Sequence, residues 1–124
     1  LGRAYQDLTE TVSGKITTTD ATATIAASIP IAQGEVYAIE ALISAKKSDE
    51  SQRGTWKVIG SFYRNTAGNV TQNGLTSEVF GQVSDTYSVD LVANTSTQAI
   101  DVKVTGKAAT TVNWSAVIKG LKVS

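Results

Sequence analysis

Apolar and polar residues alternate with a period of two in one segment after another of this 124-residue chain. Between residues 37 and 45 the odd positions are apolar, and the even positions include Glu40 and Ser44. The same alternation recurs over residues 56–62, 87–93, 100–105 and 112–119. Successive side chains of a strand point to opposite faces, so the pattern predicts strands with one buried and one wet face. Two antiparallel sheets packed through their apolar faces satisfy it.

The predicted fold class is therefore all-β, an antiparallel β-sandwich of jelly-roll type with about eight strands. The predicted strands cover residues 8–18, 22–31, 35–46, 54–65, 69–76, 78–83, 86–94, 97–105 and 110–119. Polar and small residues separate them, as in residues 65–69, where we expect a hairpin turn with Gly68 at positive φ. The inward parity also places six large residues in one core: Trp56, Phe62, Tyr87, Leu91, Val102 and Trp114.

We expect one domain over residues 8–124, preceded by an arm or linker over residues 1–7, where the alternation has not yet begun. The chain starts at Leu1 and not at methionine. We therefore expect it to be processed or to belong to a longer polypeptide, with residues 1–7 leading toward the rest of it.

The composition argues against several kinds of function. Lys and Arg together number 11, as do Asp and Glu, so the chain lacks the basic excess that nucleic-acid binding requires. The longest nearly apolar stretch, residues 36–45, is too short to cross a membrane as a helix. There is no cysteine, so disulfides and thiolate metal sites are excluded. We expect no nucleic acid, no membrane insertion and no cofactor.

Residues for catalysis are scarce, because the chain has neither histidine nor cysteine. A Ser–Lys pair stays possible, but no spacing identifies one. Glu40, Asp90 and Asp101 occupy predicted solvent-facing strand positions, which argues against a catalytic carboxylate pair. Residues 48–51 could offer oxygen ligands to calcium, although a charged surface loop explains them more simply. The sequence thus predicts no catalytic, cofactor-binding or metal-binding residues.

One surface remains as a candidate for ligand binding or subunit contact. Ile59 and Tyr63 point outward on the strand whose other face carries Trp56 and Phe62, so together they form an apolar strip. The neighbouring hairpin supplies residue types that bind sugars. The full candidate surface is Ile59, Tyr63, Arg64, Asn65, Asn69, Gln72 and Asn73.

The chain resembles small β-sandwich domains of tailed-bacteriophage structural proteins. The resemblance is carried by residues 15–22, 37–41, 60–65, 100–106 and 110–114. It implies a module of a tail fibre, another appendage or a capsid decoration, located in the virion. It also implies a homo-oligomer, often a trimer, that contacts other virion proteins, with a host surface glycan as a further partner. It supplies no catalytic residues.

Two functions follow as expectations. The first is a non-catalytic structural and adhesion module of a phage virion, placed in the outer part of the particle. The alternative is a carbohydrate-binding module of an extracellular protein, which would need an aromatic platform lined with Asn, Asp or Arg. An enzyme ranks behind both.

Overall fold

The computed structural model describes residues 8–83 and 86–124, and within them the chain forms eight strands and no helix. The strands are β1 (Thr9–Thr18), β2 (Thr24–Pro30), β3 (Glu35–Lys47), β4 (Arg53–Arg64), β5 (Thr71–Gln82), β6 (Ser88–Asn94), β7 (Ala99–Thr105) and β8 (Val112–Val123). The expected arm over residues 1–7 lies outside the described residues.

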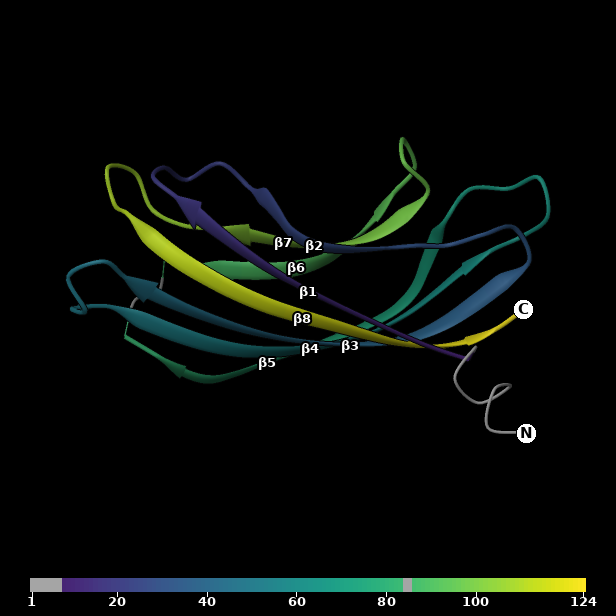
Figure 1. The fold of residues 1–124 in the computed structure, drawn as a ribbon, viewed down its shortest axis with the longest axis horizontal. Helices are drawn as coiled ribbons and strands as arrows, with labels where there is room; N and C mark the ends of the chain where they lie inside the picture. The colour runs from purple at the N-terminus through teal and green to yellow at the C-terminus, as the bar shows by residue number, and fades with distance from the viewer. Residues whose placement is uncertain (1–7, 84–85) are drawn as a thin grey trace.

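The strands form two antiparallel sheets of unequal size. The larger sheet has the order β1-β8-β3-β4-β5 and the smaller one has the order β2-β7-β6. Figure 1 shows the larger sheet as a curved layer with the smaller sheet lying over its concave side. The predicted all-β antiparallel sandwich of about eight strands is confirmed.

The strand order follows a jelly roll only in part. As in a jelly roll, β1, β8 and β3 are neighbours in one sheet while β2 and β7 pair in the other. After β3 the chain instead runs as a meander through β4 and β5, and only then does β6 cross to the smaller sheet. This is why the two sheets contain five and three strands.

Strand β5 differs from its prediction, since the single strand Thr71–Gln82 replaces the two strands predicted over residues 69–76 and 78–83. Its pairing with β4 shifts register near Phe62 and again near Trp56, so Asn73 and Phe80 are extra residues at two β-bulges. The predicted break at residue 77 lies between these two bulges, in a segment that pairs with β4 without interruption.

The hairpin between β4 and β5 also differs in detail. Ala67 adopts the positive φ of 60°, whereas Gly68 does not. The amide of Gly68 donates to the carbonyl of Asn65 at 2.9 Å, and the amide of Ala67 donates to Gln33 Oε1 at 2.9 Å. The side chain of Gln33, from the loop after β2, thus stabilises the left-handed residue, a contact that local sequence cannot reveal.

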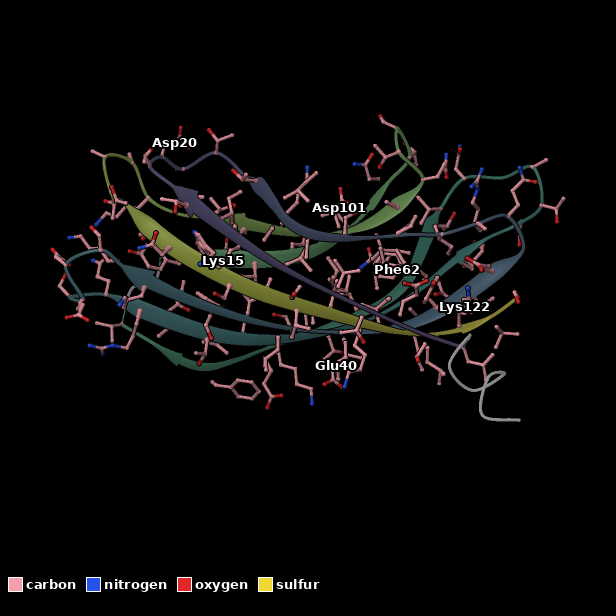
Figure 2. All side chains as sticks on the ribbon, in the orientation of Figure 1. Lys15, Asp20, Glu40, Phe62, Asp101 and Lys122 are labelled. Carbon is pink, nitrogen blue, oxygen red and sulfur yellow. The ribbon has the colours of Figure 1, made fainter. Side chains whose placement is uncertain are left out.

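The core lies between the sheets, mainly over β8, β3 and β4. The alternating residues of β3 and β8 are buried as predicted, and Figure 2 shows Phe62 between the two layers. The six residues predicted to share one core are all buried in one cluster: Trp56, Phe62, Tyr87, Leu91, Val102 and Trp114. The parity prediction is confirmed.

Trp114 lies at the centre of the aromatic part of this core. Its ring stacks on that of Trp56 with centroids 5.6 Å apart, and it contacts the Tyr87 ring at 5.9 Å. Its indole Nε1 donates a hydrogen bond to Thr18 Oγ1 at 2.9 Å, so the buried N–H has a partner. Trp114 of β8 thus joins Trp56 of β4, the last residue of β1, Thr18, and Tyr87, which lies just before β6.

Asp101 is an exception to the predicted outward-polar rule, because it is buried and not solvated. It lies on β7, the central strand of the smaller sheet, between β2 and β6. Ser28 Oγ donates to its Oδ1 at 2.6 Å, and Asn94 Nδ2 donates to its Oδ2 at 2.8 Å. Side chains from both neighbouring strands thus cover and satisfy the carboxylate.

A second buried carboxylate, that of Glu35, lies at the start of β3 in the larger sheet. Glu35 is buried, accepts a hydrogen bond from the amide of Ala32 at 2.8 Å and contacts Lys122 Nζ at 3.3 Å. The ring of Tyr37 crosses Gly120, where a Cβ atom would lie 2.7 Å from the ring. Burial, with Glu35 and Glu10 nearby, raises the pKa of Tyr37 to about 12.

We predict that Trp114→Ala destabilises the fold by about 3–5 kcal/mol, because it removes the aromatic stack and leaves a cavity. The measurement is the free energy of unfolding by urea titration. Lys119→Ala, on the exposed face of the same strand, is the matched control and should change stability by about 0.5 kcal/mol or less. A loss below about 1 kcal/mol for Trp114→Ala would contradict the central position of this ring.

We predict that Tyr37 makes stability depend on alkaline pH. Its pKa is about 12 in the fold against 10.0 for a free phenol. The unfolded chain therefore releases the proton first, so the contribution is complete below pH 10 and is lost as pH rises toward 12. In Tyr37→Phe the ultraviolet signal of tyrosinate should lose its highest-pH component. Tyr63→Phe should keep that component, and its loss there would reject the assignment.

Candidate functional site

The outer face of the larger sheet is the most extended surface available for function, since the smaller sheet covers its inner face (Figure 1). The register aligns its outward side chains in rows across β1, β8, β3 and β4. Figure 2 shows Glu40 on this outer side. The rows differ in chemistry along the strands, so the face has an apolar end and a polar end.

The apolar end lies where β1 begins and β8 finishes. Val36 pairs with Val123 on one side and with Tyr63 on the other, and Ala38 pairs with Leu121. A hollow of about 360 Å³ beside them is lined by Ile59, Ala38 and Leu121, among others. The large apolar members are 47–68% exposed: Val36, Ile59, Leu121 and Val123. We call Val36, Ala38, Ile59, Tyr63, Leu121 and Val123 the apolar end.

Of the candidate surface residues, the structure brings Ile59 and Tyr63 together on the apolar end. Val36, Leu121 and Val123 were missed by the sequence prediction. Their parity is visible in the sequence, but the strand neighbours that make them one surface depend on the register of β3 with β8. That register joins residues far apart in the chain.

Arg64 does not share a face with Tyr63, because consecutive strand residues point in opposite directions. Its Nε donates to the carbonyl of Gly68 at 2.9 Å, and its Nη1 donates to the carbonyl of Ile31 at 3.1 Å. The guanidinium thus joins the β4–β5 hairpin to the loop after β2. Both contacts are internal, so its main role here is to hold the loops together.

The remaining candidates gather at the tip of the β4–β5 hairpin and at the start of β5. Asn65 is exposed and its carbonyl closes the turn. Asn69 Oδ1 accepts from Gln98 Nε2 at 2.8 Å, so its amide is oriented by the β6–β7 loop. Gln72 and Asn73 are exposed at the first bulge of β5. These four residues therefore lie around the β4–β5 hairpin, beside the apolar end and not on it.

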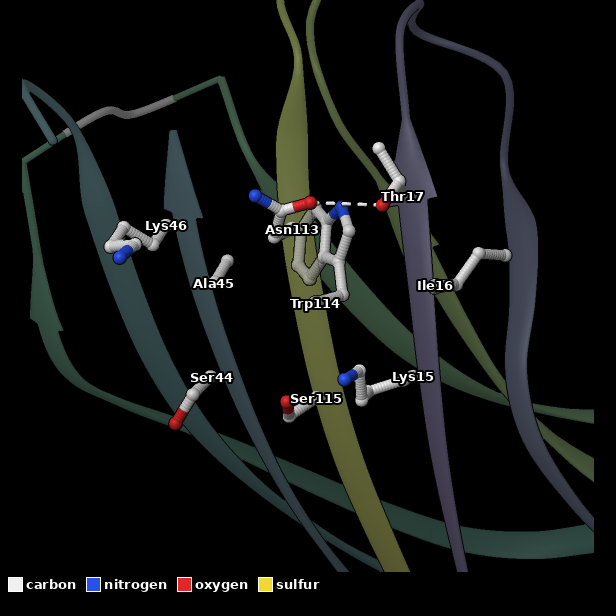
Figure 3. A pocket seen from close by; sticks show the side chains of 9 residues that line it. All are labelled: Lys15, Ile16, Thr17, Ser44, Ala45, Lys46, Asn113, Trp114 and Ser115. Carbon is white, nitrogen blue, oxygen red and sulfur yellow. Dashed lines mark hydrogen bonds between the residues drawn. The ribbon is translucent and has the colours of Figure 1, made fainter. Parts of the chain in front are cut away.

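The polar end lies toward the other end of the same face (Figure 3). A hollow of about 580 Å³ over β1, β8 and β3 is lined by hydroxyl, amide and ammonium groups together with Ile16, Ala45 and Trp114. Lys15 and Ser44 flank Ser115 in one row, and Thr17 and Lys46 flank Asn113 in the next. We call these six residues the polar end.

Asn113 is oriented within the polar end. Thr17 Oγ1 donates to Asn113 Oδ1 at 2.9 Å, and Figure 3 shows the amide nitrogen turned away from Thr17. Lys46 Nζ lies 3.5 Å from Glu50 Oε2, whereas Lys15 forms no ion pair in the described part of the chain. The arrangement offers an amide donor, two ammonium groups and hydroxyls, which suits an anionic or hydroxyl-rich ligand.

Neither end of this face assembles catalytic groups. Lys15 pairs with Ser115 across the strands, but both are exposed and no hydrogen bond joins them in the described structure. Glu40 and Asp90 are exposed on different sheets, and Asp101 is buried in its own hydrogen bonds. These three carboxylates are therefore separated in the fold, whereas a catalytic acid and base must face the same bond.

The loop of residues 48–51 is organised by its own contacts. The hydroxyl and amide of Ser51 donate to Asp49 Oδ1 at 2.6 and 3.0 Å, and Lys47 lies 3.2 Å from this carboxylate. The hydrogen bonds from Ser51 lower the pKa of Asp49 to about 2. Glu50 turns to Lys46 instead. Across residues 8–83 and 86–124 no three acidic residues converge as metal ligands would.

No protein-family model and no curated protein matches this chain. Among solved structures it is similar to the tailspike protein of Acinetobacter baumannii phage AM24, at 8% identity and a TM-score of 0.49, over 95% of this chain and 27% of that one. It is also similar to the tailspike protein of Acinetobacter phage vB_ApiP_P1, at 12% identity and a TM-score of 0.37, over 94% and 21% of the two chains. The chain thus spans about a quarter of the length of these tailspikes. The described residues contain no helix able to cross a membrane.

We predict that Arg64→Ala lowers the free energy of unfolding by about 1–2 kcal/mol, because two charge-assisted hydrogen bonds on a half-buried side chain are lost. Arg64→Lys should recover only part of this, since an ammonium cannot reproduce the planar fork. Asn65→Ala, next along the chain and exposed, is the control and should stay within about 0.5 kcal/mol of the parent. An unchanged stability for Arg64→Ala would show that these contacts do not hold the loops.

Proposed function

We propose that this chain is a non-catalytic structural and adhesion module of a bacteriophage virion, part of a tail fibre, another appendage or a capsid decoration. It assembles with copies of itself and presents a binding surface to the outside. The observation that carries the proposal is the apolar end of the outer face, which the sandwich itself leaves uncovered. Its partners are further copies of the chain and other virion proteins.

The apolar end supports self-assembly because its members are contiguous. Val36 has Val123 and Tyr63 as direct cross-strand neighbours, and Leu121 lies in the next row. Single exposed apolar residues are common on proteins, but a contiguous group with a polar rim is typical of an interaction surface. Glu40 and Lys119, in the row beside Ile59, provide that rim.

A virion location is supported by the resemblance described from the sequence and by the chemistry of the chain. It contains no cysteine and no methionine, so the side chains most sensitive to oxidation are absent, which suits a particle outside the cell. The net charge of zero gives no general attraction to nucleic acid. The resemblance favours a trimer as the assembled form. The absence of histidine, the commonest general base, and of the nucleophile cysteine supports a module without its own catalysis.

A carbohydrate-binding module is the second candidate, and the polar end is the observation that favours it. Asn113, Lys15 and Lys46 present donors beside Ser44 and Ser115. The aromatic platform that such modules use is missing there, because Tyr63 lies on the apolar end and Trp114 is buried. Glycan binding is therefore better regarded as an additional property of the adhesion module than as an alternative function.

The test combines particle labelling with assembly. Antibody raised against the chain should label purified phage particles in electron micrographs. The Val36→Lys, Leu121→Lys double variant should shift the chain to smaller species in sedimentation, because two charges would enter the contact. Ser115→Lys, outward on the same strand at the polar end, is the matched control and should assemble like the parent.

Two results would reject the proposal. The first is unlabelled particles together with specific glycan-array binding that Lys15→Gln abolishes, which would favour the carbohydrate-binding module. The second is assembly that the double variant leaves unchanged, which would remove the apolar end as the contact.

A further inference from the structure

We propose that β5 pairs edge to edge with β5 of a second copy of this chain, antiparallel and about a two-fold axis at Ser77. The two larger sheets then become one continuous sheet. This inference rests on the self-assembly proposed above but uses a different surface, the free edge of β5 in place of the apolar end.

The four edge strands of the sandwich are not alike. β1 lies against β2, so closely that a Cβ atom on Gly14 would collide with the carbonyl oxygen of Ala26. β2 carries Pro30 and a register shift, and β6 has only seven residues, including the exposed Asp90. Coverage, proline, bulges and charge are the usual means of protecting an edge.

Apart from the two bulges near its ends, β5 has none of this protection along its length. It runs for 12 residues with no proline and no lysine, and Glu78 is its single charge. Every residue from Thr71 to Gly81 is exposed. A long edge that is almost uncharged leaves backbone N–H and C=O groups available to another strand.

The inner side of β5 is also only partly covered. Residues of β4 that point inward, such as Trp56 and Phe62, are buried by the smaller sheet. On β5 the corresponding Leu75 and Val79 are 43% and 54% exposed. Phe80, the extra residue at the second bulge, and Val83, just after the strand, are also exposed, at 55% and 56%. The smaller sheet reaches β5 only through β6 and covers it in part, so about half of each of these side chains stays exposed.

The middle of β5 has the regular geometry that strand addition needs. Gly74 to Val79 pair with Ser61 to Trp56 without interruption, and the two bulges lie on either side of this segment. The bulges bend the strand at Asn73 and Phe80 and leave six residues straight between them. The segment of β5 that can pair with another strand is therefore Leu75 to Val79, with Ser77 at its centre.

The side chains of this segment are complementary to themselves. In an antiparallel pair centred on Ser77, Leu75 of each copy lies opposite Val79 of the other, so the two-fold axis generates two equivalent apolar pairs. Thr76 lies opposite Glu78, so the carboxylates do not face each other.

Neighbouring registers are worse. If the register is shifted by one residue, each inward side chain of one copy lies opposite an outward side chain of the other. A two-fold axis perpendicular to the sheet does not allow this, because it keeps the inner faces of both copies on the same side. A centre at Thr76 places Leu75 opposite Ser77 and separates the apolar pairs. A centre at Glu78 places the two carboxylates directly opposite each other, which is unfavourable. The self-complementarity at Ser77 is the reason to assign a second copy as the occupant.

Disulfide trapping tests the register directly, because the chain has no cysteine of its own. Ser77→Cys places two thiols opposite each other, and directly opposed Cα atoms about 4.5–5.5 Å apart are within disulfide reach. Mild oxidation should convert Ser77→Cys to a covalent dimer. Ser13→Cys, exposed on β1, is the control and should remain largely unlinked.

A second variant measures the pairing without cross-linking. Val79→Lys should weaken self-association by about tenfold or more in sedimentation, because each lysine would be placed against Leu75 of the other copy. Ile25→Lys, equally exposed on β2, should leave it unchanged. Circular dichroism at the concentrations used establishes that each variant is folded.

The outcomes separate the two surfaces. Trapping of Ser77→Cys together with dissociation by Val79→Lys supports the pairing at β5. An assembled parent in which Ser77→Cys stays unlinked and Val79→Lys has no effect overturns this inference, while the apolar end can still account for the assembly. A pairing of β5 with some other strand would show as dissociation by Val79→Lys without trapping, and would also overturn it.

Discussion

The inner face of a five-stranded sheet is covered here by only three strands, and most properties of the molecule depend on that mismatch. The smaller sheet reaches over β8, β3 and β4, so the aromatic core of Trp56, Trp114 and Tyr87 forms there. On one side the sandwich is closed by β1 against β2. On the other side β5 extends beyond the cover, and its apolar residues stay in contact with water.

The last strand of the chain has a central place in this arrangement. β8 pairs with β1 on one side and β3 on the other, so the larger sheet is continuous only when residues 112–123 have been added. Trp114, on the same strand, links Thr18 to Trp56. The fold therefore depends on contacts between the two ends of the sequence, which are costly in chain entropy and are repaid by burial of the core.

Much of this could be predicted from the alternation alone. Tyr37 and Trp114 are buried because of their parity, which any strand with one wet face must obey. The alternation fails where a different constraint is stronger. Asp101 is buried because a central strand has side chains on both flanks, and Ala67 takes the left-handed conformation because Gln33 holds it. Both constraints come from residues distant in sequence.

The candidate surface was predictable only in part, for a related reason. Ile59 and Tyr63 could be identified as outward and apolar within one strand. Whether they form a patch depends on which strands lie beside them, and the register that brings Val36 and Val123 into the same row is a property of the sheet. Arg64 illustrates the converse. It is a sugar-binding residue type beside an exposed tyrosine, yet alternation turns it to the other face, where it bonds to two carbonyls.

The two proposed contacts are geometrically independent, and this bears on what the module can build. A two-fold axis through Ser77, perpendicular to the sheet, keeps the outer faces of both copies on the same side. Because the strands run antiparallel, the apolar end of one copy then lies diagonally opposite that of the other. Pairing at β5 would thus leave both apolar ends open to further neighbours. It would also place the two polar ends on one broad outer face. The single charge on the free edge of β5 and the six residues of the apolar end are the features that would allow both proposed contacts at once.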